Sequence, residues 1–179
     1  MRSFKQQALA TLLTTAALVA PTANAETGGS LGVGLGIPYG GVFGVAYNHT
    51  VTDSLDLTAS IGSAYGTGWN LGGKYFFGDG EDGFRVSAFY GTNGAVEVKE
   101  CYYSYYYSSC SEEVENFTGL TAGIGWGHRA YASGWNFDLM IVITSGVFDE
   151  VDRLEDEGYE DVSGNTSRVA LSGGYHWAF

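Results

Sequence analysis

Histidine is the side chain most often used as a general base, and this chain has three, His49, His128 and His176. A histidine that activates a serine nucleophile must lie within hydrogen-bond reach of the hydroxyl group. None of the three begins a His-x-Ser sequence. We therefore predict no catalytic residues, and we expect each histidine to be a polar residue at an interface or in the interior of the protein.

Two cysteines, Cys101 and Cys110, flank a tyrosine-rich segment of eight residues. In an exported chain they are expected to form one disulfide, which should stabilise so short a loop by about 2–3 kcal/mol. Tyrosine and serine make binding contacts at low entropic cost, so we expect a recognition surface for an extracellular protein or glycan. The alternative is a loop that only shields the molecule or packs on lipopolysaccharide sugars. The tyrosines of this candidate surface are Tyr102, Tyr103, Tyr105, Tyr106 and Tyr107.

Acidic residues dominate the charge, with twenty Asp and Glu against eight Lys and Arg. This balance argues against nucleic acid as a partner. Thirteen of the acids fall within residues 97–115 and 149–161, and neither stretch contains the Asp-x-Asp-x-Asp-Gly core of a calcium loop. We predict no metal site and no cofactor, and we expect a solvated acidic surface. Loose bridging of divalent cations to lipopolysaccharide is the alternative.

The first 25 residues have the features of a secretory signal peptide. Arg2 and Lys5 are positive, residues 8–20 are apolar, and Ala23-Asn24-Ala25 is a small-x-small cleavage site. The apolar run is too short for a membrane-spanning helix. We therefore predict that residues 1–25 are cleaved, which leaves residues 26–179 as one domain.

The rest of the chain alternates with a period of two, which is typical of strands. One face of nearly every segment is apolar or aromatic, and the other is small or polar. Ile37 is expected on the apolar face, and Val96 and Val98 are expected to face Val114. A soluble sandwich would have polar outward faces, so we predict an all-β fold, an eight-stranded antiparallel up-and-down transmembrane β-barrel. The segments are Ser30–Ile37, Val42–His49, Ser54–Ile61, Trp69–Phe77, Phe84–Val98, Val114–Trp126, Trp135–Thr144 and Thr166–Phe179.

The last segment places Tyr175, Trp177 and Phe179 on one face, and the sequence YHWAF ends on the aromatic residue. This ending resembles the carboxy-terminal assembly signal of Gram-negative outer-membrane barrels. The chain from residue 26 onward resembles small eight-stranded barrels of the OmpA transmembrane-domain, OmpX and opacity-protein type. The resemblance implies a monomer in the bacterial outer membrane, in contact with its lipid and lipopolysaccharide. It also implies recognition by the barrel assembly machinery through the last strand.

Loop lengths predict the orientation, because outer-membrane barrels have short periplasmic turns and longer extracellular loops. The acidic loop at residues 148–164 and the tyrosine-rich segment are then extracellular, and all three histidines lie at the periplasmic end. The predicted periplasmic turns are at Thr52, 78–83 and 128–134, and the predicted extracellular loops are at Pro38, 62–68, 95–116 and 146–164.

Six ionisable side chains are expected to point into the barrel. An isolated charge inside a narrow barrel costs several kcal/mol, and eight strands leave room only for side chains. We therefore predict a plug of paired charges and no open pore, with an ion or proton path as the alternative. Five of the six lie toward the periplasmic end, and Arg168 lies toward the other. The set is Asp56, Lys74, Arg85, Asp138, Arg168 and His176.

Two other functions fit a small outer-membrane barrel, a lipid A-modifying enzyme and a small-solute pore. The enzymes of this kind use Ser, His and an acid near the outer interface, whereas the histidines here are expected at the periplasmic end. The sequence therefore favours a surface protein without catalysis, whose extracellular segments serve adhesion, recognition or envelope structure.

Overall fold

The computed structural model describes most of the chain after the predicted signal peptide, which lies outside the described residues. The backbone is described for residues 28–63, 66–103, 108–156, 162–164 and 167–179, and side chains for 28–63, 66–96, 114–154 and 167–179.

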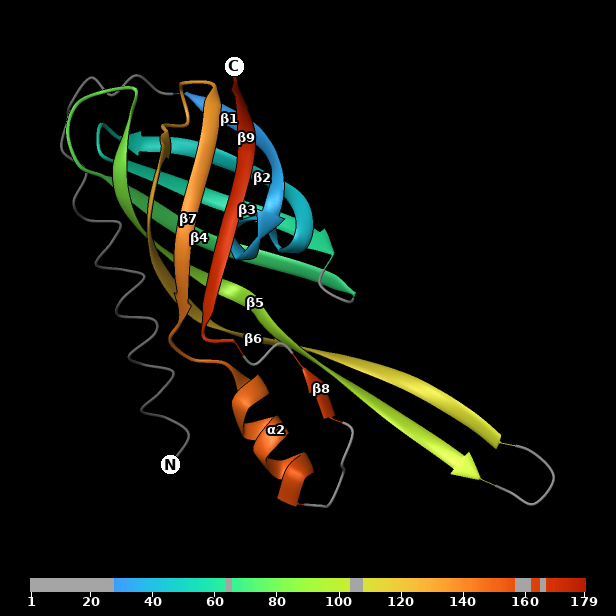
Figure 1. The fold of residues 1–179 in the computed structure, drawn as a ribbon. Helices are drawn as coiled ribbons and strands as arrows, with labels where there is room; N and C mark the ends of the chain where they lie inside the picture. Colours follow the sequence, from blue (N-terminus) through green and yellow to red (C-terminus); the bar gives the residue numbers. More distant parts are fainter. Residues whose placement is uncertain (1–27, 64–65, 104–107, 157–161, 165–166) are drawn as a thin grey trace, which may run out of the picture.

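Eight strands form a closed, entirely antiparallel barrel, as predicted (Figure 1). Each pairs with its neighbours in sequence, and the last pairs with the first. None of the helices in the described part of the chain is long and apolar enough to cross a membrane. Three more elements lie off the barrel wall, namely η1 (Ile37–Tyr39), α2 (Gly146–Asp156) and β8 (Val162–Gly164). The barrel strands are β1 (Gly29–Gly36), β2 (Gly41–Thr52), β3 (Leu55–Ser63), β4 (Thr67–Phe76), β5 (Asp82–Tyr103), β6 (Ser108–His128), β7 (Gly134–Val142) and β9 (Val169–Ala178).

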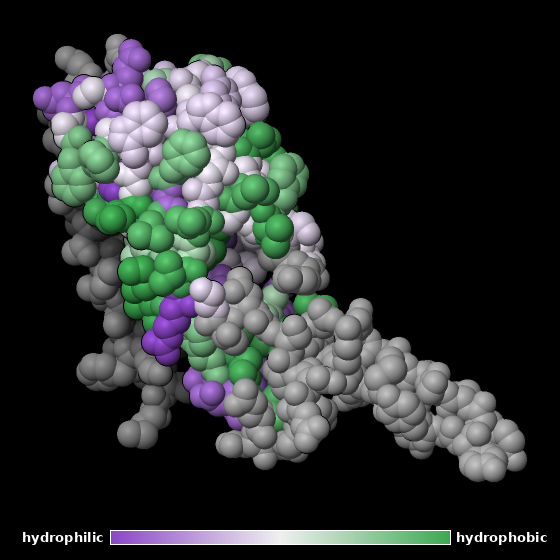
Figure 2. All heavy atoms as spheres, viewed as in Figure 1, coloured by the Kyte–Doolittle hydropathy of each residue, from purple (hydrophilic) through white to green (hydrophobic). Residues whose placement is uncertain are grey.

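The barrel wall has an apolar outer face, and Figure 2 shows apolar residues across its middle. Leu57, Leu71 and Ile141 are each about half exposed, whereas Ala46 and Met140 on the inner face are fully buried. Successive residues of a strand point to opposite faces, so the period of two in the sequence becomes an apolar outside and a mixed inside.

The two ends of the barrel differ in shape (Figure 1). At the terminal end, as we call the end where β9 finishes, short turns join the strands. At the opposite end, the arm end, β5 and β6 continue past the wall as a two-stranded arm, residues 94–103 paired with 108–117. The predicted separation of short turns from long connections is therefore present.

The turn between β1 and β2 folds into the barrel. The backbone reverses at Gly36, whose φ of 96° suits glycine, and Ile37, Pro38 and Tyr39 are buried. A Cβ atom at Gly34 would lie 2.6 Å from the Tyr39 ring, so the absence of a side chain there leaves room for the ring. The prediction that Ile37 faces outward is therefore wrong, because the strand ends one residue before it.

The arm begins at a β-bulge between Thr92 and Gly94. A bulge adds one residue to one strand and shifts the facing pairs. As a result Val114 lies opposite Glu97, and the prediction that Val96 and Val98 face Val114 is wrong by one residue.

Residues 148–164 are not the irregular loop that the sequence predicted. They contain most of α2 and the short strand β8, which pairs with Val96–Val98 of the arm. Val147 and Leu154 of α2 are buried against Val96, with Val151 beside them. The base of the arm is therefore held by an apolar cluster on one side and by a backbone ladder at its edge.

A second apolar cluster fills the barrel interior toward the arm end. It consists of Ile37, Phe89, Met140 and Val142, and Phe148 of α2 packs against it. Helix α2 thus links the arm to the interior of the barrel.

Candidate functional site

Arg85 and Asp138 form a buried ion pair inside the barrel, near the terminal end. The Arg85 Nη2 atom lies 2.9 Å from Asp138 Oδ2, and Arg85 Nε donates to Oδ1 at 3.2 Å. A third donor atom, Nη1, contacts the Asn136 side-chain oxygen. The two side chains are therefore matched in hydrogen-bond geometry as well as in the sign of their charges.

Asp56 is buried on β3 and accepts two hydrogen bonds. Thr50 Oγ1 donates to its Oδ1 at 2.9 Å, and the backbone N–H of Ala130 donates to its Oδ2 at 2.8 Å. Ala130 belongs to the turn between β6 and β7, so Asp56 fastens that turn across the terminal end.

Lys74, Asn48, His176 and Tyr39 form a chain of side-chain contacts through the interior. Lys74 Nζ donates to Asn48 Oδ1 at 2.8 Å. Asn48 Nδ2 lies 2.7 Å from His176 Nδ1, and His176 Nε2 lies 2.8 Å from Tyr39 Oη.

This chain of contacts fixes the donors and acceptors. An ammonium group only donates, so the Asn48 atom that faces Lys74 must be the amide oxygen. The amide nitrogen then donates to His176 Nδ1, which leaves the proton of the neutral ring on Nε2, where it is donated to Tyr39 Oη. His176 is thus a structural link that ties η1 to the wall.

Arg129 is a buried interior residue that the sequence analysis missed. Its guanidinium group lies 4.8 Å from the centre of the Phe76 ring and donates to the carbonyl oxygen of Gly80 at 2.7 Å. It also donates to the carbonyl oxygens of Asp53 and Gly78. One side chain from the β6–β7 turn thus joins the two other turns at the terminal end.

The structure brings five of the six predicted interior residues into this polar interior and leaves out Arg168. Arg168 is exposed, and its guanidinium group lies 4.7 Å from the centre of the Phe148 ring. The prediction for Arg168 is wrong because β9 begins at Val169. The alternation that directs every second side chain of β9 into the barrel therefore does not extend to Arg168.

The other two histidines lie on the outside of the terminal end. His49 is exposed beside the Tyr47 ring, and His128 Nδ1 contacts the Trp135 carbonyl oxygen at 3.2 Å. Within the described residues, none of the three histidines contacts a serine hydroxyl group, and no group of three or more His, Cys, Asp or Glu could hold a metal ion.

The arm carries the predicted recognition residues. Its backbone register places Cys101 directly opposite Cys110. The disulfide and the side chains of Tyr102 and Tyr103 fall outside the described side chains, and Tyr105, Tyr106 and Tyr107 fall outside the described residues altogether. The disulfide and the recognition surface therefore stay predictions.

The residues of the predicted assembly signal each contact another aromatic ring at the terminal end. The ring centres of Tyr175 and Trp177 are 5.0 Å apart, and the ring of Trp135 lies 5.4 Å from that of Tyr175. Phe179 stacks on Tyr47 of β2 at 6.5 Å. Aromatic side chains thus gather on the outer face around this end of the barrel.

Comparisons with protein-family models, with curated proteins and with solved structures find no match for this chain.

Proposed function

We propose that the protein is a monomeric barrel of the bacterial outer membrane, without catalytic activity or an open pore, that presents the arm outside the cell to bind a protein or glycan. The observation that carries the proposal is the arm itself. Two strands leave a closed barrel, and buried Val96, Val147 and Leu154 hold their base.

The apolar outer face supports the membrane location. Exposed Leu57, Leu71 and Ile141 would have no favourable contact in water, whereas lipid chains would cover them. The aromatic residues of the terminal end then lie at the periplasmic interface, where amphipathic rings are favoured. The last strand would serve as the signal for the barrel assembly machinery.

The filled interior supports a role without transport. The Arg85–Asp138 pair and the Arg129 contacts occupy the terminal end, and Ile37, Phe89, Met140 and Val142 fill the interior toward the other. Water and solutes would have to displace these contacts to pass.

A rigid base is what a recognition tip needs, because order before binding lowers the entropic cost of binding. The tyrosines of the candidate recognition surface would offer large contact areas with few rotatable bonds. The surrounding acidic residues favour a ligand that is neutral or basic at its contact surface.

The test is binding of the protein to host cells or immobilised glycans when all five tip tyrosines, Tyr102, Tyr103, Tyr105, Tyr106 and Tyr107, are changed to Ser. We expect at least a tenfold loss of binding at equal surface expression. The matched control changes Asp149 and Asp152 of α2 to Asn, which alters the other extracellular segment and should leave binding intact. Unchanged binding by the tyrosine variant would refute recognition by the tip.

A further inference from the structure

We propose that a cavity in the barrel wall at the arm end binds one acyl chain of a membrane lipid, which enters sideways from the bilayer. The inference rests on the membrane location proposed above, and it does not depend on recognition by the arm. The lining of the cavity includes Gly94 and Ala95 at the base of the arm, but none of the tyrosines of the candidate recognition surface.

The wall is incomplete where the cavity lies. The pairing of β1 with β9 ends at Leu35 and Gly173, because β1 turns into the barrel at Gly36. Residues 169–172 of β9 pair with β7 on one side. On the other side, no strand of the described chain pairs with them. An opening in the wall therefore faces sideways, toward the surrounding membrane.

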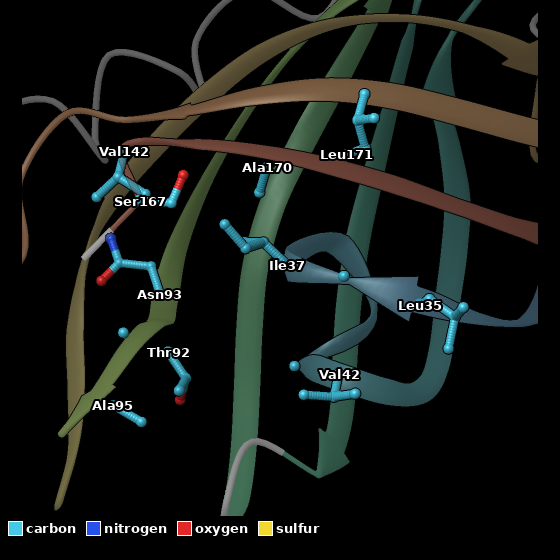
Figure 3. A pocket seen from close by; sticks show the side chains of 13 residues that line it. Leu35, Ile37, Val42, Thr92, Asn93, Ala95, Val142, Ser167, Ala170 and Leu171 are labelled. Atoms are coloured by element: carbon cyan, nitrogen blue, oxygen red, sulfur yellow. The ribbon is translucent and has the colours of Figure 1, made fainter. Parts of the chain in front are cut away.

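The cavity has a volume of about 340 Å³, and Figure 3 shows the side chains that line it. These residues range from exposed to buried. At its mouth, Leu35, Val42 and Leu171 are 56%, 62% and 80% exposed on the outer face. Further in, Ile37 and Val142 are less than 10% exposed. The same apolar surface thus continues from the lipid-facing wall into the barrel.

The depth of the opening suits the outer leaflet. The mouth lies at the arm end, where exposed Phe43 follows Val42 on β2 and the backbone N–H of Trp69 donates to Thr92 of the lining. The Trp69 ring lies 6.1 Å from the ring of Tyr90. Aromatic rings of this kind mark the membrane–water interface. A lipid head group could remain at that level while one of its chains bends into the cavity.

The size and polarity of the cavity favour a chain over a whole lipid or a polar solute. Its volume is near the lower end of the range of about 300–1,000 Å³ for ligand pockets. Apolar cavities tend to exclude water and to bind apolar molecules. A soluble ligand that entered from the arm end would have to displace Phe148, which packs on Ile37 and its neighbours.

One polar group in the lining lacks a partner. Asn93 is 8% exposed, and its Nδ2 donates to the Thr144 carbonyl oxygen at 2.8 Å and to Thr121 Oγ1 at 3.2 Å. Its Oδ1 is buried without a hydrogen bond among the described residues. Buried acceptors are usually paired, but a hydrocarbon chain supplies no donor, so the proposed binding of an acyl chain does not depend on this oxygen atom.

The test uses a phospholipid with a photoactivatable diazirine near the end of one chain, in vesicles that contain the full-length protein. Labelled residues are located by mass spectrometry. We expect label on outward-facing Leu57 and Ile141 and also on Ile37 and Val142, at least five-fold above the interior residue Met140. A free fatty acid that carries the same diazirine serves as a second probe.

Two variants and a control connect the label to the cavity. Ala170→Phe fills the cavity from β9 and should lower the labelling of Ile37 and Val142 at least three-fold. Val42→Trp, at an exposed position of the mouth, should also lower the labelling of Ile37 and Val142 at least three-fold, and it leaves the interior side chains unchanged. Ala88→Phe, on the outer face of β5 and away from the cavity, should leave the labelling unchanged.

Label confined to outward-facing residues would overturn the site, and so would labelling by the free fatty acid but not by the phospholipid. Absence of label even on Leu57 and Ile141 would refute the membrane location, and the site with it. Loss of arm binding in the tyrosine variant is a separate measurement, so the two proposals can fail independently.

Discussion

Arg85 and Asp138 come from strands that are not neighbours, β5 and β7, and meet inside the barrel at 2.9 Å. Such a pair is costly to place away from water but also costly to break, because the remaining charge has no substitute partner. Its effect is to join, through the interior, the two strands that lie on either side of β6.

Removal of one partner should therefore lower the free energy of unfolding more than removal of both partners. We expect Asp138→Leu to lower the free energy of unfolding by about 3–5 kcal/mol. The double variant Arg85→Met, Asp138→Leu should recover most of the loss, because no unpaired charge is left. Urea titration of the protein folded in lipid vesicles measures both values. Equal destabilisation by the single and the double variant would contradict the account.

The residue pattern predicts these interior side chains only where a strand determines their direction. Asp56, Lys74 and His176 lie within strands, and alternation alone placed them inside. Arg129 lies in a turn, where no period applies, and its burial depends on the carbonyl groups of two other turns. The local sequence around Arg129 does not predict those hydrogen-bond partners.

Helix α2 connects the arm to the barrel through a small apolar face. Val147 and Leu154 are buried, whereas Asp149 and Asp152 are exposed. On the exposed side, Arg153 donates hydrogen bonds to Glu150, and this contact holds the pKa of the Glu150 carboxyl group below its ordinary value. The helix is therefore acidic outside and apolar underneath.

A charged residue on the buried face of α2 should detach the helix from the arm while the barrel stays folded. Trypsin can cut after Arg153 only when this segment opens. We expect Val147→Asp, a change on the buried face but away from the cleaved bond, to raise the rate of this cleavage at least tenfold, and the control Asp149→Asn to leave it unchanged. A cleavage rate for Val147→Asp equal to that of the parent protein would contradict the packing of α2.

Helix α2 was missed because its acidic composition predicted an irregular loop, and composition alone does not determine secondary structure. Val147, Val151 and Leu154 follow the spacing of one helical face, and this period could have revealed α2. The inward fold of η1 had no comparable signal. It depends on the free volume beside Gly34 and on the contact of Tyr39 with His176, both of which exist only once the barrel has closed.

The whole molecule joins an apolar wall, a filled interior and a protruding arm. The wall and the count of strands follow from alternation, so the sequence predicted them directly. The lateral opening was not predictable, because it results from one strand leaving the wall early and its neighbour continuing. If the barrel spans a membrane, its two ends must lie in different compartments.

Cysteine labelling on intact cells tests that claim most directly. In a Cys101→Ser, Cys110→Ser background, a new cysteine is placed by Asp149→Cys in α2 or by Asp79→Cys in the β4–β5 turn, both at exposed positions. The reagent is a maleimide coupled to a polyethylene glycol too large to pass through porins. The account predicts labelling of the Asp149→Cys protein on intact cells, and of the Asp79→Cys protein only after the outer membrane is permeabilised. Equal labelling of both on intact cells, or protection of the Asp149→Cys protein, would contradict it.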